Sequence, residues 1–253
     1  MHERSGCNAD MRWRSMLTIL LLATLAACAN APPRNPMAQW VPSPNHGPRR
    51  PILIVLHATT QESVRDSLRT LRTRNSGGPV SAHYLIGRDG DRYQLVADQL
   101  RAWHAGPGRW GTITDVNSVS IGIELDNDGE SPFPDAQITS LVKLLEDLCE
   151  RHGIPRSQVV AHSDIAPARK VDPGKWFPWQ RLFEAGFGVW PTPATGEPPA
   201  GFDPWLALQA IGYSLVDRAA SVRAFHLRFR GTDTETLDAE DARILFALTR
   251  APD

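Results

Sequence analysis

The chain has 253 residues, of which 42% are hydrophobic and 22% charged, and its formal net charge at pH 7 is -1. This length is sufficient for one good-sized core plus a small accessory unit. Because proteins that bind nucleic acids usually carry a basic excess, the charge balance argues against a nucleic-acid partner. The chain has 21 prolines, and they are concentrated at 32–51 and 191–204, which predicts linkers in those two places.

The first 28 residues have the pattern of a targeting segment. Two arginines precede an apolar stretch over 16–27, which is too short to span a bilayer comfortably. The sequence Leu-Ala-Ala-Cys that ends at Cys28 resembles a bacterial lipobox, in which the cysteine is lipidated. We therefore expect 1–28 to be a signal peptide, Cys28 to be the lipidation site and 29–49 to be a tether. The alternative is an ordinary secretory signal with a chance cysteine.

The other two cysteines carry no sign of a disulfide framework. Signal-peptide removal takes away Cys7, and Cys149 falls in a helical pattern of leucines, which predicts a buried and inert thiol.

Ala29 follows the lipobox cysteine, where an aspartate favours retention at the inner membrane. We therefore expect an anchor on the periplasmic face of the outer membrane, with a soluble periplasmic protein as the alternative.

The segment 50–187 carries alternating strand and helix patterns. Buried or half-buried strands are predicted at 51–56, 82–86, 92–96, 119–125 and 158–161, and helices at 61–73 and about 135–152. The second and third strands form a hairpin around an Asp-Gly turn. Strands mixed with covering helices predict an α/β domain with a mixed central β-sheet flanked by helices.

The C-terminal part predicts a small helical domain over 204–253, joined by a Pro-rich linker at 188–203. Helices are predicted at 204–212, 216–230 and 238–249, with apolar residues at helical spacing. Their order resembles the three-helix peptidoglycan-binding module, although any three-helix unit needs such packing residues. The arginines at 223, 228 and 230 either face cell-wall carboxylates or cover a solvated helix face.

Three histidines and one aspartate lie where predicted strands end. His57 and His162 each follow a buried strand, His104 lies in a loop, and Asp172 comes ten residues after His162. Two imidazoles and one carboxylate with an open fourth position are typical of a catalytic zinc site. Spacing alone leaves each histidine equally open to an ordinary hydrogen-bonded role.

Five short segments in a fixed order decide between these interpretations. They are Ile-Val-Leu-His-Ala-Thr-Thr at 54–60, Ser-Ala-His-Tyr-Leu-Ile at 81–86, Trp-His-Ala-Gly at 103–106, Ile-Gly-Ile-Glu-Leu at 121–125, and Ala-His-Ser-Asp-Ile-Ala-Pro-Ala-Arg-Lys-Val-Asp-Pro-Gly at 161–174. The succession resembles the type 2 N-acetylmuramoyl-L-alanine amidases over roughly 50–185, and most of all their outer-membrane lipoprotein branch.

The resemblance implies that His57, His162 and Asp172 hold one zinc ion. Glu124 is then expected to be the general base and later the acid, and Lys170 to stabilise the oxyanion. Glu124 also has apolar neighbours on both sides, where an ionisable group is structurally out of place; the alternative is an exposed edge glutamate. The bond cleaved in the family is the amide between the lactyl group of muramic or anhydro-muramic acid and L-alanine.

Five further residues are candidates for contact with a peptidoglycan or muropeptide substrate: Trp103, His104, Tyr84, Asn127 and Arg169. For His104 a supporting role behind the metal ligands is equally open, and Arg169 has the alternative of pairing with local acids. His83 is expected to line or support the site. We expect a monomer. Two other classes remain open: a non-catalytic wall-recognition protein with this fold, and a zinc endopeptidase that acts on stem peptides.

Overall fold

The computed structural model describes residues 34–48, 51–192 and 196–250. The expected signal peptide, Cys28 and the start of the expected tether lie outside these ranges. No helix in the described ranges is long and apolar enough to cross a membrane.

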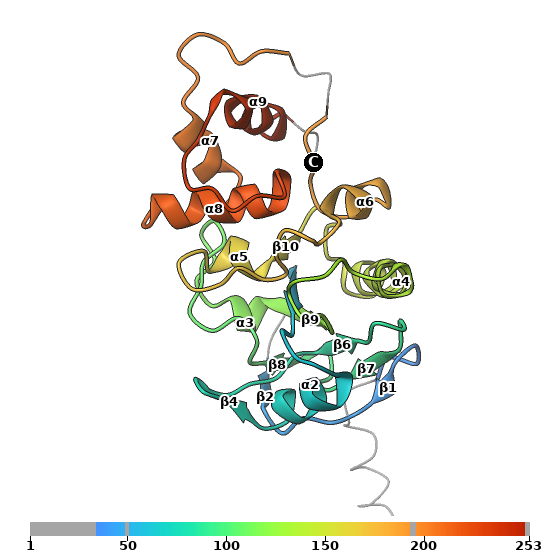
Figure 1. Cartoon of the computed structure of the whole chain (residues 1–253). Helices are drawn as coiled ribbons and strands as arrows, with labels where there is room; N and C mark the ends of the chain where they lie inside the picture. The colour runs from blue at the N-terminus through green and yellow to red at the C-terminus, as the bar shows by residue number, and fades with distance from the viewer. Residues whose placement is uncertain (1–33, 49–50, 193–195, 251–253) are drawn as a thin grey trace, which may run out of the picture. The chain divides into compact units, whose positions relative to one another are not determined.

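A six-stranded mixed sheet forms the centre of the fold, in the order β1-β7-β6-β9-β3-β10 (Figure 1). Its strands are β1 (Gln39–Trp40), β3 (Leu53–Ala58), β6 (Tyr84–Ile86), β7 (Arg92–Gln94), β9 (Ser120–Leu125) and β10 (Val159–Ala161). The four strands β6, β9, β3 and β10 are parallel, and β6 pairs with β7 as an antiparallel hairpin. The mixed sheet that the sequence predicted is confirmed.

Side chains alternate between the two faces of this sheet. On β3, Ile54 and Leu56 enter the main core beneath the long helix α4 (Asp135–His152). Leu53 and Val55 belong to a second cluster on the opposite face. Since β3 is buried along its whole length, its sequence is continuously apolar rather than alternating. His57 continues the row of Leu53 and Val55, and therefore lies on the face away from α4.

One face of helix α4 is buried and mostly apolar. Its buried residues recur at helical spacing, and they are Gln137, Ile138, Ser140, Leu141, Leu144, Leu145, Leu148 and Cys149. The helix ends at Gly153, which has φ 63°, a left-handed conformation that glycine adopts without steric cost. Cys149 is a buried free thiol, as the leucine pattern predicted.

Several short elements were not predicted from the sequence. They are β2 (His46–Pro48), β4 (Arg74–Asn75), β5 (Gly78–Pro79), β8 (Leu100–Ala102), α3 (Val116–Val119), α5 (His162–Ile165) and α6 (Trp179–Glu184). Elements of two to six residues are too short to show a period. The helix predicted at 61–73 is present as α2, in the shorter range Val64–Leu71. The segment expected to be a tether also differs, because β1 pairs in parallel with β7 and β2 pairs with β8.

Helices α7 (Pro204–Ala210), α8 (Arg218–Phe229) and α9 (Ala239–Leu248) follow, coloured orange to dark red in Figure 1. Each begins at an aspartate whose side chain accepts hydrogen bonds from the first backbone N–H groups of the helix. Residues such as Leu208, Phe225 and Leu245 form a core of their own. The three helices lie within the ranges that the sequence predicted.

Candidate active site

The sheet topology brings the three expected metal ligands together. Strands β3 and β10 are parallel neighbours with Leu56 opposite Ala161, so His57 and His162 both emerge at the same sheet edge. Their Nδ1 atoms lie 2.8 Å apart. Oδ2 of Asp172 lies 3.1 Å from Nδ1 of His162 and 3.4 Å from Nδ1 of His57. Three potential ligand atoms from distant parts of the sequence therefore converge on one point.

The chemistry and spacing of these atoms fit a zinc ion. His57 and His162 are buried, Asp172 is mostly buried, and each offers one ligand atom to a common centre. Zinc in proteins is bound by imidazole nitrogen and carboxylate oxygen at about 2.0–2.2 Å, which places neighbouring ligand atoms of a tetrahedron about 3.3 Å apart. The separations found here lie close to that value. Three protein ligands also leave the fourth position of a catalytic site open.

A backbone carbonyl determines the tautomer of His162. Nε2 of His162 lies 3.0 Å from the carbonyl oxygen of Ala105. Because a carbonyl only accepts hydrogen bonds, Nε2 carries the proton and donates it. The lone pair of the neutral ring is then on Nδ1, which is the atom that faces His57 and Asp172.

A longer chain of hydrogen bonds determines the tautomer of His57. The Ser120 hydroxyl donates to the Val116 carbonyl at 2.6 Å, so its oxygen accepts from Nε2 of His104 at 3.2 Å. Neutral His104 then has its lone pair on Nδ1 and accepts from Nε2 of His57 at 2.9 Å. His57 is left with its lone pair on Nδ1, toward the cluster. Such partners behind the metal ligands orient them.

Gly122 leaves the space that this series of hydrogen bonds requires. It lies on β9 beneath the His104 ring, and a Cβ atom at this position would come within 2.4 Å of Cγ of His104. His83 supports the same point of the strand, since its Nδ1 accepts from the backbone N–H of Gly122 at 3.0 Å and its Nε2 donates to the carbonyl of Leu100 at 2.9 Å. The expectation that His83 supports the site agrees with this placement.

Electrostatics favour the ligand forms of these side chains. Burial, followed by the neighbouring His162, lowers the pKa of His57 to about 4, so that its ring is neutral at neutral pH. Burial alone raises the pKa of Asp172, but His162 and His57 outweigh it and hold that pKa far below its usual value. A neutral imidazole and an ionised carboxylate are the forms that bind a metal.

Glu124 and Lys170 lie at the same cavity. Glu124 is opposite His57 in the β3–β9 register and is partly exposed toward the cavity. Burial, and after it the charge of Asp172, raise the pKa of Glu124 to about 8, while Lys170 opposes the rise. The Lys170 charge also contributes to lowering the pKa of His57, which indicates that the ammonium group is near the cluster. A carboxyl with a pKa close to neutrality is suited to proton transfer in both directions.

The cavity has a volume of about 360 Å³, within the range of small-molecule sites. The three potential ligands, Glu124, Lys170 and Trp103 line one part of it. From there it extends beneath α2 and the β4–β5 hairpin, where its wall consists of Gln61, Ser67, Thr70, Leu71, Asn75, Val80 and Ser81. These mostly polar side chains offer hydrogen-bonding groups beside the cluster.

A family model described as N-acetylmuramoyl-L-alanine amidase matches residues 47–175, which include every residue of the cluster. The chain belongs to this family. It is 42% identical over 160 residues to the N-acetylmuramoyl-L-alanine amidase AmiD of Escherichia coli K12, a match that covers 57% of this chain and 56% of that protein. The chain thus matches little more than half the length of this curated relative.

Solved structures of the amidase family show the same fold. A complex of AmiD from E. coli with the substrate anhydro-N-acetylmuramic acid-L-Ala-D-gamma-Glu-L-Lys superposes with a TM-score of 0.69 at 36% identity, and covers 80% of this chain and 89% of that one. The structure of AmpDh3 from Pseudomonas aeruginosa superposes with a TM-score of 0.70 at 32% identity, and covers 86% and 97% of the two chains. The fold class predicted from the sequence is therefore confirmed.

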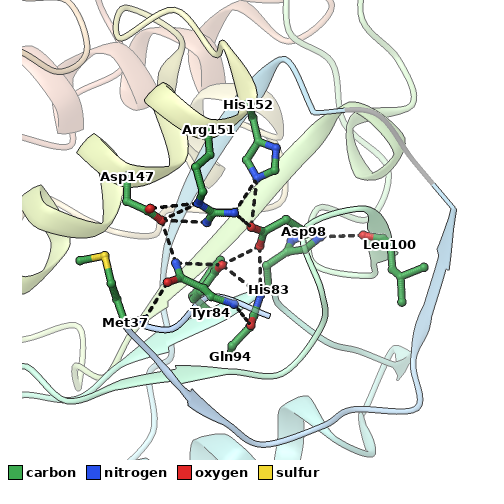
Figure 2. A network of polar contacts seen from close by, with 10 residues as sticks. Met37, His83, Tyr84, Gln94, Asp98, Leu100, Asp147, Arg151 and His152 are labelled. Carbon is green, nitrogen blue, oxygen red and sulfur yellow. Dashed lines mark hydrogen bonds and ion pairs between the residues drawn. The ribbon is translucent and has the colours of Figure 1, made fainter. Parts of the chain in front are cut away.

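Tyr84 does not lie at the cavity, contrary to the sequence-based expectation. It belongs to the core under α4, on the opposite sheet face from His57. Figure 2 shows its hydroxyl within a polar network, where it donates to Asp98 at 2.6 Å and accepts from Gln94 at 3.0 Å. Arg151 and His152 at the end of α4 also contact Asp98. Tyr84 thus joins the sheet to α4 and lies away from the cavity.

Asn127 is likewise placed away from the cavity. Its side chain is fully buried, accepts from the backbone N–H of Gly129 at 2.7 Å and donates to the carbonyl of Ser131 at 3.2 Å. It therefore shapes the loop after β9. A position close to Glu124 in the sequence suggested substrate contact, but an asparagine in a tight turn commonly bonds its own loop backbone.

His104 and Arg169 border the cavity but have partners within the protein. His104 is mostly buried behind His57, so the supporting role fits better than direct substrate contact. Arg169 donates to the carbonyls of Ala105 and Pro107, both at 2.7 Å, rather than to a local acid. Since Ala105 also accepts from His162, Arg169 reinforces the loop that orients this ligand. Trp103 lines the cavity, as expected.

Sequence reasoning assigned no role to Thr59 and Thr60, which line the cavity beside His57. Thr60 has φ 48°, in the left-handed region where a β-branched residue is strained. Such strain is concentrated at functional sites. The pair lies within the segment that resembles the amidases, but backbone strain leaves no mark in the sequence. Gln61, Thr70 and Asn75 also line the cavity and were missed, because a local pattern does not show which polar side chains face a cavity.

Proposed function

We propose that the protein is a zinc-dependent N-acetylmuramoyl-L-alanine amidase. The bond that it hydrolyses is the amide between the lactyl group of N-acetylmuramic or anhydro-muramic acid and L-alanine, in peptidoglycan or in released muropeptides. The observation that carries this proposal is the convergence of Nδ1 of His57, Nδ1 of His162 and Oδ2 of Asp172 within a cavity that also holds Glu124 and Lys170. Relatives of the same family are named for this reaction.

The side chains divide the reaction among them. His57, His162 and Asp172 would hold a zinc ion, which would lower the pKa of a water molecule to about 7 and polarise the scissile carbonyl. Glu124 accepts the proton of the attacking water and returns it to the alanine nitrogen as that amine departs. The Lys170 ammonium stabilises the negative charge on the carbonyl oxygen in the tetrahedral state. The Ser120–His104–His57 chain and Ala105 hold the two imidazoles with their Nδ1 lone pairs toward the metal.

The mostly polar part of the cavity, next to α2 and the β4–β5 hairpin, is suited to hold the substrate. Gln61, Thr70 and Asn75 lie along it, and Trp103 supplies an aromatic wall at the metal end. Muropeptides combine hydroxyl, amide and carboxylate groups, so a wall of amides and hydroxyls matches them better than an apolar one. An aromatic ring next to the reacting bond packs against the apolar face of a sugar.

Hydrolysis of purified muropeptides tests the proposal directly. Anhydro-muramyl tripeptide and tetrapeptide are incubated with zinc-loaded protein, with and without a chelator, and the products are identified by mass spectrometry. We expect intact stem peptide and free muramic sugar, and no product with the chelator. No cleavage by zinc-loaded protein would indicate a wall-binding protein instead, and a cut within the stem peptide would indicate an endopeptidase.

We also propose that Cys28 is lipidated and that the enzyme acts in the periplasm at the outer membrane. The support is the Leu-Ala-Ala-Cys sequence with Ala29 after it. Mass analysis of the N-terminus of protein extracted from membranes tests this. A Cys28 that carries a diacylglyceryl group on its sulfur and an acyl chain on its amino group has a characteristic mass. A mature protein that begins at another residue, or that carries no lipid, would refute the anchor while leaving the amidase proposal intact.

A further inference from the structure

Helix α8 of the C-terminal part packs against α5, the short helix that begins with the potential zinc ligand His162 (Figure 1). Arg228 of α8 is 3% exposed and donates to Oδ2 of Asp164 in α5 at 2.5 Å. Its second amino group donates to the carbonyl of Val159 in β10 at 3.1 Å. The guanidinium also lies 4.2 Å from the ring of Trp179. A fully buried ion pair therefore joins α8 to the strand and helix on either side of His162.

Tyr213, in the turn between α7 and α8, makes a second buried contact with the same carboxylate. Its hydroxyl donates to Oδ1 of Asp164 at 2.5 Å. Burial, and after it the Asp164 charge, raise the pKa of Tyr213 well above its usual value, so the hydroxyl keeps its proton and remains a donor. Two of the three hydrogen bonds that Asp164 accepts from the residues described thus come from the C-terminal helices.

The third of these bonds links Asp164 to the start of the metal-binding segment. Oδ2 of Asp164 accepts the backbone N–H of Ala161, the residue immediately before His162, at 2.8 Å. Asp164 is fully buried, so solvent water does not replace a lost donor. A helix of one turn is too short to be stable by itself, because a first turn fixes several residues for one hydrogen bond. Its tertiary contacts must therefore hold α5 in place.

Further contacts reach the rest of the site. Arg223 of α8 donates to the carbonyl of Pro167 at 3.1 Å, within the loop that leads to Lys170 and Asp172. The backbone N–H of Gly111 donates to the carbonyl of Gly212 at 2.9 Å, which ties the C-terminal part to the loop after Trp103 and His104. Of the three arginines that the sequence left open, Arg228 is buried, and Arg223 and Arg230 are partly exposed but pair with acids of the same chain. They are therefore poorly placed to bind wall carboxylates, the alternative that the sequence had left open.

We propose that the C-terminal helices position the metal-binding segment 161–172, with Tyr213, Arg223 and Arg228 as the positioning residues. The segment carries His162, Lys170 and Asp172. The contacts from the C-terminal helices therefore orient three of the five residues assigned to zinc and catalysis. This inference rests on the proposed zinc site. It gives the C-terminal helices a role in the integrity of the site, whether or not they also bind peptidoglycan.

The test measures zinc affinity of the full chain by competition with a chromophoric chelator, and amide hydrogen exchange over 161–172. The variants are Tyr213→Phe, which keeps the ring and removes only the donor, and Arg223→Ala, which frees the Pro167 carbonyl. Loss of a direct partner of a metal ligand weakens metal binding by about 10- to 100-fold, and these two side chains act one contact further from the ligands, so the lower end of that range applies. We expect about tenfold weaker zinc binding for each variant, with faster exchange in this segment.

Tyr84→Phe is the matched control for Tyr213→Phe. It removes an equally buried tyrosine hydroxyl from an aspartate, Asp98, but on the sheet face away from the metal cluster. Arg243→Ala in α9 is the control for Arg223→Ala, since Arg243 pairs only with exposed glutamates in the described structure. Both controls should bind zinc within about twofold of the parent and leave exchange over 161–172 unchanged.

Two results would overturn the inference. One is zinc binding and exchange over 161–172 that remain at the parent level in both Tyr213→Phe and Arg223→Ala. The other is an equal loss of zinc affinity in Tyr84→Phe, which would attribute the effect to general stability. A parent protein that binds no zinc would instead refute the proposed metal site, and so the two failures are distinguishable.

Discussion

Replacing Gly122 with alanine tests the hydrogen-bond chain behind His57. The added Cβ would lie 2.4–2.6 Å from three atoms of the His104 ring. Ordinary carbon contacts are about 3.5–4.0 Å, so the ring must retreat by about 1 Å or more. The hydrogen bond from His57 to His104 is 2.9 Å long and does not survive such a shift. His57 then loses the partner that keeps its Nδ1 lone pair toward the cluster.

Two magnitudes follow from this geometry. Overpacking of a dense core costs about 1–3 kcal/mol of unfolding free energy. Loss of a partner behind a metal ligand lowers metal affinity by about 10- to 100-fold. Gly122→Ala is therefore expected to be moderately destabilised in the absence of metal, and to gain clearly less stability than the parent when zinc is added. Ligand binding stabilises the folded state in proportion to the logarithm of its affinity, which makes this difference measurable.

Urea unfolding with and without zinc, together with a chelator competition, provides the assay. Gly47→Ala is the control, since Gly47 is also in a strand and its added Cβ would meet Arg101 at an ordinary 3.7 Å. The control should remain within about 0.5 kcal/mol of the parent, as surface substitutions usually do. A Gly122→Ala protein that binds zinc as tightly as Gly47→Ala would refute the proposed role of His104.

Three further predictions concern single side chains. Glu124→Gln should lower muropeptide hydrolysis by about 10²- to 10⁴-fold, the usual contribution of a general base, with zinc affinity by chelator competition nearly unchanged; unaltered turnover would exclude Glu124 from proton transfer. Asp172→Asn should lose most zinc in metal analysis after dialysis, because it replaces the anionic ligand with a neutral amide; full zinc content would contradict this ligand set. The pKa of Asp98 is about 2, because His152, Tyr84 and Arg151 outweigh the opposing effect of burial. Its contribution to stability, about 2 kcal/mol from the shift, is present above about pH 4 and is lost as the pH falls toward 2. In urea unfolding, the deficit of Asp98→Asn relative to the parent should shrink over that interval, and a constant deficit would be evidence against the network in Figure 2.

The long elements and the ligand set could be predicted from the sequence. The apolar run before His57, the leucine spacing of α4 and the Asp-Gly turn are local signals, because complete burial, burial of one helix face and a tight turn each restrict which residues a short segment can carry. The ligands were found because the segments around His57 and His162 resemble those of a known family. Spacing alone did not distinguish a ligand from any other histidine.

Contacts between distant segments were decided only by the tertiary structure. The face on which Tyr84 lies depends on its strand register, and the place of His104 depends on Ser120 and Gly122, both on β9. Neither relation has a local period. The ion pair between Arg228 and Asp164 joins residues that are 64 positions apart in the sequence. In the sequence, both side chains look like ordinary surface charges. The sequence by itself thus determined which residues can bind metal, whereas packing decided which of them are held in a geometry that can do so.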